Sequence, residues 1–113
     1  MEKEHRIIEE IKIIKFIQKV KAYGLDNIET TEHCFFRLSQ KQRKIHTEEE
    51  LKRIVWNEKP LLVGIETNGN YNAIYFYLRD KKIRIILRLS LKKLYIVTFY
   101  ILNVKQEEQL KNG

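Results

Sequence analysis

The sequence predicts an α+β fold, with N-terminal helices packed on one face of a four-stranded antiparallel β-meander. Apolar residues recur at helical spacing through residue 58 and at a period of two from residue 59 onward. The strand-like segments are joined by links so short that they fit only antiparallel hairpins. A chain of 113 residues, 43% of them apolar, can bury one modest core. We therefore expect a single domain over residues 1–113, with a helical half in 1–58, an antiparallel sheet in 59–104 and a polar tail in 105–113.

Two helices are expected before residue 43. Isoleucine, phenylalanine and valine residues at helical spacing predict the first helix over residues 4–21. Gly24 suits the left-handed position that often follows the last turn of a helix. A threonine, Thr30 or Thr31, can cap a second helix that runs to about Gln42.

A third helix is expected to begin at Thr47. Thr47 and Glu50 match a capping box, in which two side chains satisfy backbone N–H groups of the first turn. Glu48 and Glu49 suit the positive end of the helix dipole. The helix must stop before Pro60, because the residue that precedes a proline disfavours helical backbone.

Four strands are expected in the second half of the chain, where β-branched and aromatic residues alternate with polar ones. Asn68-Gly69 is a strong signal for a tight turn between the first two. The expected strands are residues 61–66, 71–79, 82–90 and 93–104.

Strand parity predicts which side chains share a face of the sheet. In the third strand one face is wholly apolar, and we expect it to pack on the helices; Arg84 and Arg88 lie on the other face. In the fourth strand the expected helix-facing residues are Tyr95, Val97, Phe99 and Ile101. Thr98 and Tyr100 would then share the more open face with the two arginines.

Composition excludes several classes of protein. No run approaches the roughly 20 apolar residues that cross a bilayer, and charged residues interrupt the N-terminal isoleucines, unlike a secretory signal. The single cysteine, Cys34, excludes an internal disulfide and fits a reducing compartment. We expect a soluble cytoplasmic domain without a membrane partner.

Positive charge is concentrated in the last half of the chain. Residues 59–113, with ten basic and four acidic residues, contribute +6 of the net charge of +7. Residues 79–93 alone hold seven basic residues and one acidic residue. Such a region is typical of proteins that bind nucleic acid or an acidic partner, although a lysine-rich surface can also serve solubility.

The motifs for several chemistries are missing. There is no glycine-rich phosphate loop, and no second pair of cysteine or histidine residues accompanies His33 and Cys34 at zinc-ligand spacing. Adjacent helical residues point about 100° apart, so Cys34 is a poor nucleophile beside His33 and a better candidate for buried packing. We expect neither a metal nor a cofactor.

The remaining chemistry is metal-free acid–base catalysis on a phosphodiester. His33 and Arg37 lie four residues apart, on one face of the expected second helix. A neutral imidazole can take a proton from a ribose 2′-hydroxyl, and a guanidinium matches phosphate oxygens. The alternative is that His33 is a capping-turn residue and Arg37 a surface charge. His46, just before the Thr47 cap, is either a second acid or base or a packing residue.

The order of these features resembles the small ribonuclease toxins of the barnase, colicin-tRNase and RelE superfamily, especially the RelE-like and BrnT-like proteins. The resemblance covers roughly residues 30–102. It rests on His33, Arg37, Arg43, Ile45, the segment 47–50 in "QRKIHTEEEL" and the segment 97–100 in "LYIVTFY". It implies RNA cleavage by 2′-hydroxyl attack, which leaves a 2′,3′-cyclic phosphate, and inhibition by an antitoxin or immunity protein.

Three hypotheses follow. The first is a cytoplasmic endoribonuclease toxin that acts on tRNA or ribosome-associated RNA; its catalytic residues would be His33, Arg37, Thr98 and Tyr100, and its RNA-binding residues Arg43, His46, Lys81, Lys82, Arg84 and Arg88. The second is a non-catalytic RNA- or DNA-binding module. The third is an interaction protein from a virus or mobile element that binds an acidic host partner. The exposed edges of a four-stranded sheet leave homodimerisation open.

Overall fold

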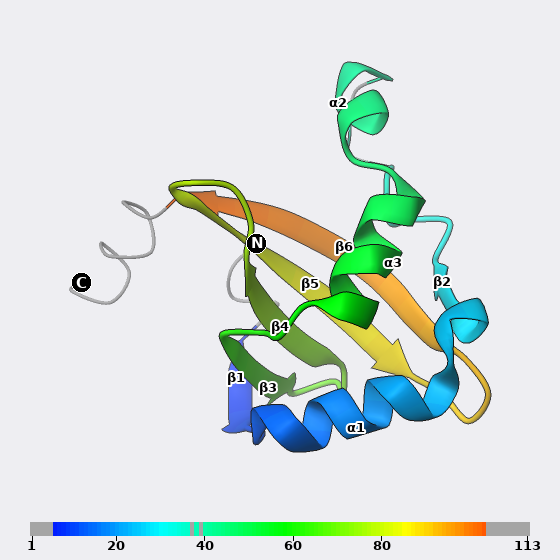
Figure 1. Cartoon of the computed structure of the whole chain (residues 1–113), viewed down its shortest axis with the longest axis vertical. Coiled ribbons are helices and arrows are strands. Elements are labelled where there is room, and N and C mark those ends of the chain that lie inside the picture. The colour runs from blue at the N-terminus through cyan, green and yellow to red at the C-terminus, as the bar shows by residue number, and fades with distance from the viewer. Residues whose placement is uncertain (1–5, 37, 39, 104–113) are drawn as a thin grey trace.

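The computed structural model describes residues 6–36, 38 and 40–103, and within them the sheet has six strands in the order β1-β3-β4-β5-β6-β2 (Figure 1). Five neighbouring pairs join the strands, and the β2–β6 pair is parallel while the others are antiparallel. The strands are β1 (Ile7–Glu10), β2 (Ile28–Thr30), β3 (Leu62–Glu66), β4 (Tyr71–Phe76), β5 (Lys81–Leu89) and β6 (Leu94–Asn103). The prediction of a four-stranded antiparallel meander is therefore wrong. The meander β3–β6 forms as expected, but a further strand extends the sheet at each of its edges.

Strand β1 takes up residues that were expected to be helical. The helix α1 (Ile13–Tyr23) begins later, and the chain before it pairs antiparallel with β3. Gly64 explains the close approach of the two strands, because a Cβ built there would lie 2.2 Å from Ile7 Cγ2. Helical spacing alone could not show this, since Ile7 pairs with the distant residue Glu66 and packs over Gly64. The expected end of the helix is correct, with Gly24 at φ +85°.

Strand β2 covers the other edge of the meander. Ile28 is fully buried in the core, and Thr31 N–H continues the ladder by donating to Ile96 O at 3.0 Å. A short 3-10 turn, η2 (Leu25–Asn27), separates α1 from β2. The two sheet edges expected to be open are thus occupied by β1 and β2.

The expected second helix does not form over residues 30–42. Residues 32–36 are turns, and the helix α2 (Gln40–Ile45) is short and projects away from the sheet (Figure 1). Cys34 is fully buried in the core, as its expected packing role requires. The helix on which the pairing of His33 with Arg37 depends is absent over residues 32–36, and Arg37 lies outside the described residues, so that pairing is not tested.

The third helix, α3 (Glu48–Asn57), begins where the capping box predicted. The Thr47 hydroxyl accepts a hydrogen bond from Glu50 N–H at 3.2 Å. The helix ends at Asn57, before Pro60. None of the helices in the described residues has the length and apolar content that a membrane crossing needs.

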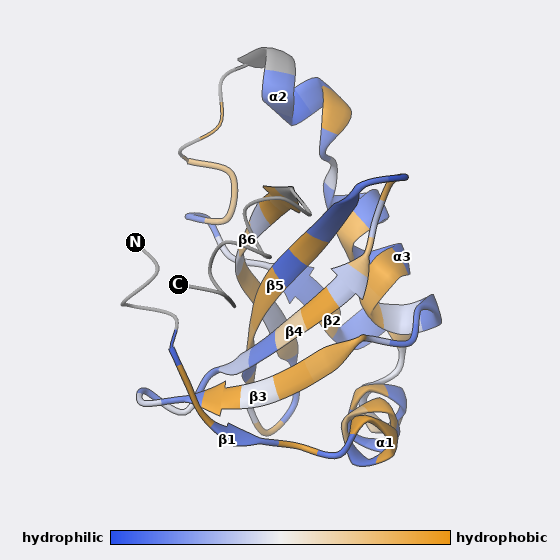
Figure 2. Ribbon diagram, turned by 90° about the vertical axis from the view of Figure 1, so that its left-hand side faces the viewer, coloured by the Kyte–Doolittle hydropathy of each residue, from blue (hydrophilic) through white to orange (hydrophobic). Residues whose placement is uncertain are grey.

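Helices α1 and α3 pack on one face of the sheet, where the core lies (Figure 2). The core contains Phe16 and Val20 from α1, Leu51, Ile54 and Val55 from α3, and Val63, Ala73, Tyr75, Ile83, Ile85, Leu87, Leu94, Ile96 and Phe99 from the strands. No helix of the described chain packs on the opposite face, which we call the open face.

An irregularity in β6 reverses the expected orientation of its first residues. The register moves from Ile86↔Thr98 to Leu87↔Ile96, so that one extra residue, Val97, is inserted in β6. Leu94 and Ile96 are consequently buried in the core, and Tyr95 lies opposite Arg88 on the open face. The prediction that Tyr95 faces the helices is wrong, because strict alternation does not survive a bulge.

Candidate functional site

The open face gathers basic and aromatic side chains from β5 and β6. Arg84 lies directly opposite Tyr100, and Ile86 opposite Thr98. The Arg88 guanidinium lies over the Tyr95 ring, 4.8 Å from its centroid. Lys82 has the same strand parity as Arg84. The expectation that Arg84, Arg88, Thr98 and Tyr100 share one face is therefore confirmed by the strand register.

The centre of the open face is well packed rather than hollow. Ile86 and Asn72, directly paired across β5 and β4, are both fully buried. The Asn72 side-chain amide donates to Glu66 Oε2 at 3.0 Å, and Glu66 is only 1% exposed. Arg88, by contrast, is exposed. This face therefore offers a firm surface with a basic and aromatic half on β5 and β6.

The basic run of residues 79–93 does not form one patch. Lys81 lies opposite Tyr77, and Tyr77 N–H donates to Lys81 O at 3.1 Å. Its position in β5 places Lys81 on the side of the sheet that faces the helices, whereas Lys82 lies on the open face. Lys93 contacts Glu29 Oε1 at 2.6 Å, and this hydrogen bond raises the pKa of Lys93. The basic residues are thus divided between two faces and a turn.

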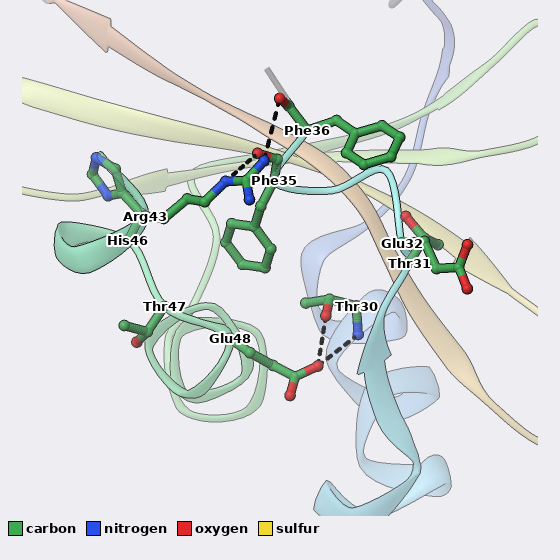
Figure 3. A pocket seen from close by; sticks show the side chains of 9 residues that line it. All are labelled: Thr30, Thr31, Glu32, Phe35, Phe36, Arg43, His46, Thr47 and Glu48. Atoms are coloured by element: carbon green, nitrogen blue, oxygen red, sulfur yellow. Dashed lines mark hydrogen bonds between the residues drawn. The ribbon is translucent and has the colours of Figure 1, made fainter. Parts of the chain in front are cut away.

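A pocket of about 540 Å³ opens on the helix side, between β2 and the start of α3 (Figure 3). It is lined by Thr30, Thr31, Glu32, Phe35, Phe36, Arg43, His46, Thr47 and Glu48. We call it the His46 pocket. Figure 3 shows Thr30 and Glu48 together on one side, Arg43 and His46 on the other, and the Phe35 ring between them.

Arg43 ties α2 to the turn segment before it. Its Nε donates to Phe35 O at 3.1 Å, and its Nη2 donates to Phe36 O at 3.4 Å. A guanidinium has five N–H groups, so these two bonds leave donors that can face a bound anion. Arg43 is exposed, so its remaining donors are open to solvent.

Glu48 closes the opposite side of the pocket. Its Oε2 accepts hydrogen bonds from the Thr30 hydroxyl at 2.5 Å and from Thr30 N–H at 3.2 Å. The hydrogen bond from the Thr30 side chain is the main cause that lowers the pKa of Glu48. An ionised carboxylate here disfavours a phosphate on the Thr30 side of the pocket.

His46 is held by two polar partners behind the pocket. Its Nδ1 lies 3.7 Å from Glu50 Oε1 and 3.4 Å from the Tyr77 hydroxyl oxygen. The Tyr77 hydroxyl donates to the same Glu50 oxygen at 3.0 Å. Burial, followed by the hydrogen bond with Glu50, raises the pKa of Tyr77 to about 12. The imidazole also packs edge-on against Phe99, with ring centroids 5.5 Å apart.

This arrangement is a positioned histidine with an arginine beside it. Glu50 and Tyr77 contact one ring nitrogen, so Nε2 is the second site through which His46 can exchange a proton. The His46 side chain is 15% exposed, which permits contact with a ligand while packing fixes the ring. Such a group can act as an acid or a base on a molecule in the pocket.

His33 is placed differently from the expected catalytic residue. It is exposed in the turns that precede α2, and its ring meets the exposed Phe36 edge-on, with centroids 5.0 Å apart. Its neighbours Glu32 and Phe36 line the His46 pocket. Thr98 and Tyr100 face the opposite side of the sheet from His46. Because Arg37 lies outside the described residues, the expected catalytic set of His33, Arg37, Thr98 and Tyr100 stays a prediction.

Sequence reasoning missed Glu50 and Tyr77 as partners of His46. The capping box explains Glu50 only as part of the helix cap, although its spacing of four from His46 already allows contact along a helix. Tyr77 comes from the β4–β5 hairpin, and no sequence signal pairs it with His46. Among the residues that the structure describes, no three His, Cys, Asp or Glu side chains cluster as metal ligands would.

The fold and the two surfaces define an α+β protein with a basic, aromatic sheet face and a histidine pocket on the helix side. Compared with protein-family models, curated proteins and solved structures, the chain has no match. The resemblance to small ribonuclease toxins therefore stays a prediction from the short motifs around His33, Arg43 and Thr47.

Proposed function

We propose that this chain is a metal-independent endoribonuclease whose acid–base residue is His46. One observation supports this proposal above the others: His46 Nδ1 lies 3.7 Å from Glu50 and 3.4 Å from the Tyr77 hydroxyl oxygen, in a pocket that Arg43 also lines. A histidine near a carboxylate and an arginine can supply the general base and the charge stabilisation that phosphodiester cleavage by a 2′-hydroxyl uses. Arg43, expected to bind RNA, and His46, expected to bind RNA or to act as a second acid or base, become the central residues.

In the proposed reaction the RNA supplies its own nucleophile. His46 Nε2 takes the proton of a ribose 2′-hydroxyl while the 2′-oxygen attacks the adjacent phosphorus. The bond from phosphorus to the 5′-oxygen breaks, and that oxygen takes up a proton from solvent. The products are a 2′,3′-cyclic phosphate and a 5′-hydroxyl. Arg43 stabilises the charge that builds up on the phosphate oxygens, and Glu50 stabilises the imidazolium that forms.

The proposed substrate is cytoplasmic RNA, either tRNA or ribosome-associated RNA, and the proposed regulator is a cognate inhibitor protein. The net charge of +7 favours a polyanion. Lys82, Arg84 and Arg88 lie on the open face, on the opposite side of the sheet from His46, and would hold only RNA that extends around the sheet from the reacting phosphate. The choice among RNA classes rests on the resemblance and not on a contact in the structure.

The decisive experiment incubates the purified chain with labelled RNA in EDTA and compares two histidine variants. His46→Ala should lower the cleavage rate by about 100-fold or more, the usual contribution of a general base, while RNA affinity is retained. Glu50→Gln should lower it less. His33→Ala is the matched comparison, because it removes an exposed imidazole from a neighbouring turn. A substrate with a single 2′-deoxyribose at the cleavage site should resist. Full activity in His46→Ala would exclude this mechanism.

A second candidate function is RNA binding without cleavage through the open face. The Arg88–Tyr95 contact of 4.8 Å and the Arg84–Tyr100 pair favour it, because arginines beside aromatic rings suit phosphates and stacked bases. In that case the wild type leaves RNA intact and binds it with a steep salt dependence. Arg88→Gln would then weaken binding, whereas His46→Ala would not.

A further inference from the structure

A second pocket lies where α1 meets the ends of β4 and β5. Its volume is about 420 Å³, within the range of pockets that accept ligands. It is lined by Lys19, Ala22, Tyr23, Tyr71, Leu89 and Leu91, none of which lines the His46 pocket. Tyrosine, leucine and alanine make most of this lining, so it suits an apolar side chain.

Leu91, at the rim of this pocket, is 95% exposed in the β5–β6 turn. The turn itself is firmly held. The Ser90 hydroxyl donates to Lys93 O at 2.7 Å, and Ser90 N–H donates to the same oxygen at 3.0 Å. The Tyr23 hydroxyl donates to Ser90 O at 2.5 Å, which fastens the turn to α1. The leucine is thus presented to solvent on a fixed scaffold, as exposed anchors of protein interfaces are.

The charges around this pocket are mainly positive. Lys19 belongs to the lining, and Lys92 is exposed beside Leu91. Lys93 is already paired with Glu29 at 2.6 Å. The carboxylate nearest in sequence to the lining residue Tyr23 is that of Asp26, three residues later. The two lysines, one in the lining and one beside the exposed leucine, complement an acidic segment. The apolar lining complements one large apolar side chain of that segment.

We infer that this pocket binds an acidic segment of a partner protein, which inserts one aromatic or aliphatic side chain between Tyr23, Tyr71 and Leu91. The occupant is chosen by charge and by shape: the lysines select carboxylates, and the lining selects an apolar group. The inference does not depend on RNA cleavage, because the pocket shares no residue with His46 and its partners.

The test uses a short fluorescent peptide of aspartate and glutamate with one central phenylalanine. Binding is followed by fluorescence anisotropy and by methyl NMR signals of Ala22, Leu89 and Leu91. We expect saturable binding with a dissociation constant below about 1 mM. The methyl NMR signals of these three residues should shift on binding. Leu91→Ser and Lys19→Glu should each weaken binding roughly tenfold. Leu78→Ser is the matched control, because Leu78 is also an exposed leucine, at 57%, but lies in the β4–β5 turn.

Three results would overturn the inference. The peptide could bind Leu91→Ser as well as it binds the wild type. A peptide with serine in place of the phenylalanine could bind equally well, which would reduce the interaction to charge alone. Single-stranded oligouridine could shift the Leu89 and Leu91 signals while the acidic peptide does not, which would make this an RNA surface. Loss of RNA cleavage in the His46 variants would affect none of these results.

Discussion

The Tyr77 hydroxyl donates a 3.0 Å hydrogen bond to Glu50 Oε1, so the β4–β5 hairpin is joined to the first turn of α3 directly behind His46. Tyr77→Phe removes the donor and leaves a partly buried carboxylate with one bond fewer. We expect a loss of about 1–2 kcal/mol in the free energy of unfolding, since hydrogen bonds to charged groups exceed neutral ones. Urea denaturation measures it. Tyr95→Phe, which removes a phenol hydroxyl on the open face, is the control and should change stability less.

The same contact predicts a dependence of stability on alkaline pH. Burial and Glu50 raise the pKa of Tyr77 in the folded chain to about 12, from an ordinary value of 10.0. The folded state therefore retains the phenol proton after the unfolded state has begun to lose it. The resulting stability is fully present below pH 10 and is lost as pH rises toward 12.

Tyr77→Phe should accordingly lose less stability between pH 9 and pH 11 than the wild type does. The loss will not vanish, because burial also raises the pKa values of Tyr75 and Tyr23. Denaturation curves at both pH values give the comparison. An identical pH dependence in the two proteins would show that the phenol of Tyr77 is not buried against Glu50.

The pairing of β1 with β3 depends on the absence of a side chain at Gly64. Gly64→Ala would place a methyl group 2.2 Å from Ile7 Cγ2, so Ile7 must move. We expect a cost of about 1–3 kcal/mol from overpacking. The double variant with Ile7→Ala should recover much of it, which a double-mutant cycle measures. Gly69→Ala is the control: that site has φ +87° and open space, so Ile7→Ala should not rescue it.

The parts of the fold that could be predicted from the sequence are those determined by nearby residues. The cap at Thr47 and the hairpin at Asn68-Gly69 depend on side chains within a few positions, and both occur where expected. Strands β1 and β2 depend on distant partners, Gly64 and the edge of β6, so local periodicity could not show them. The inserted Val97 has no signature in an uninterrupted apolar strand.

In the candidate site, too, the contacts set by nearby residues could be predicted from the sequence, and those made by distant residues could not. Arg84 and Tyr100 were placed on one face by strand parity, which the register of β5 and β6 maintains. His46 and Glu50 could have been paired from their spacing, but Tyr77 reaches them only through the fold. The case for His33 depends on a helix at this position, and residues 32–36 form turns instead, so its surroundings differ from the expected ones.

The hydrogen bonds between Glu48 and Thr30 join α3 to β2 and predict a loss of stability in acid. Thr30 lowers the pKa of Glu48 below its ordinary value of 4.5 in the folded chain. The stabilisation is therefore present above pH 4.5 and is lost as pH falls through the lower folded value. Because Glu48 is exposed and solvent screens its charge, the stabilisation should stay below about 1 kcal/mol.

Glu48→Gln should be less stable than the wild type at pH 7, and the difference in the free energy of unfolding should disappear in acid. Glu49→Gln, which removes an exposed charge from the same helical turn, is the matched control. A Glu48→Gln deficit that persists undiminished at low pH would show that the carboxylate of Glu48 is not the source of the stabilisation.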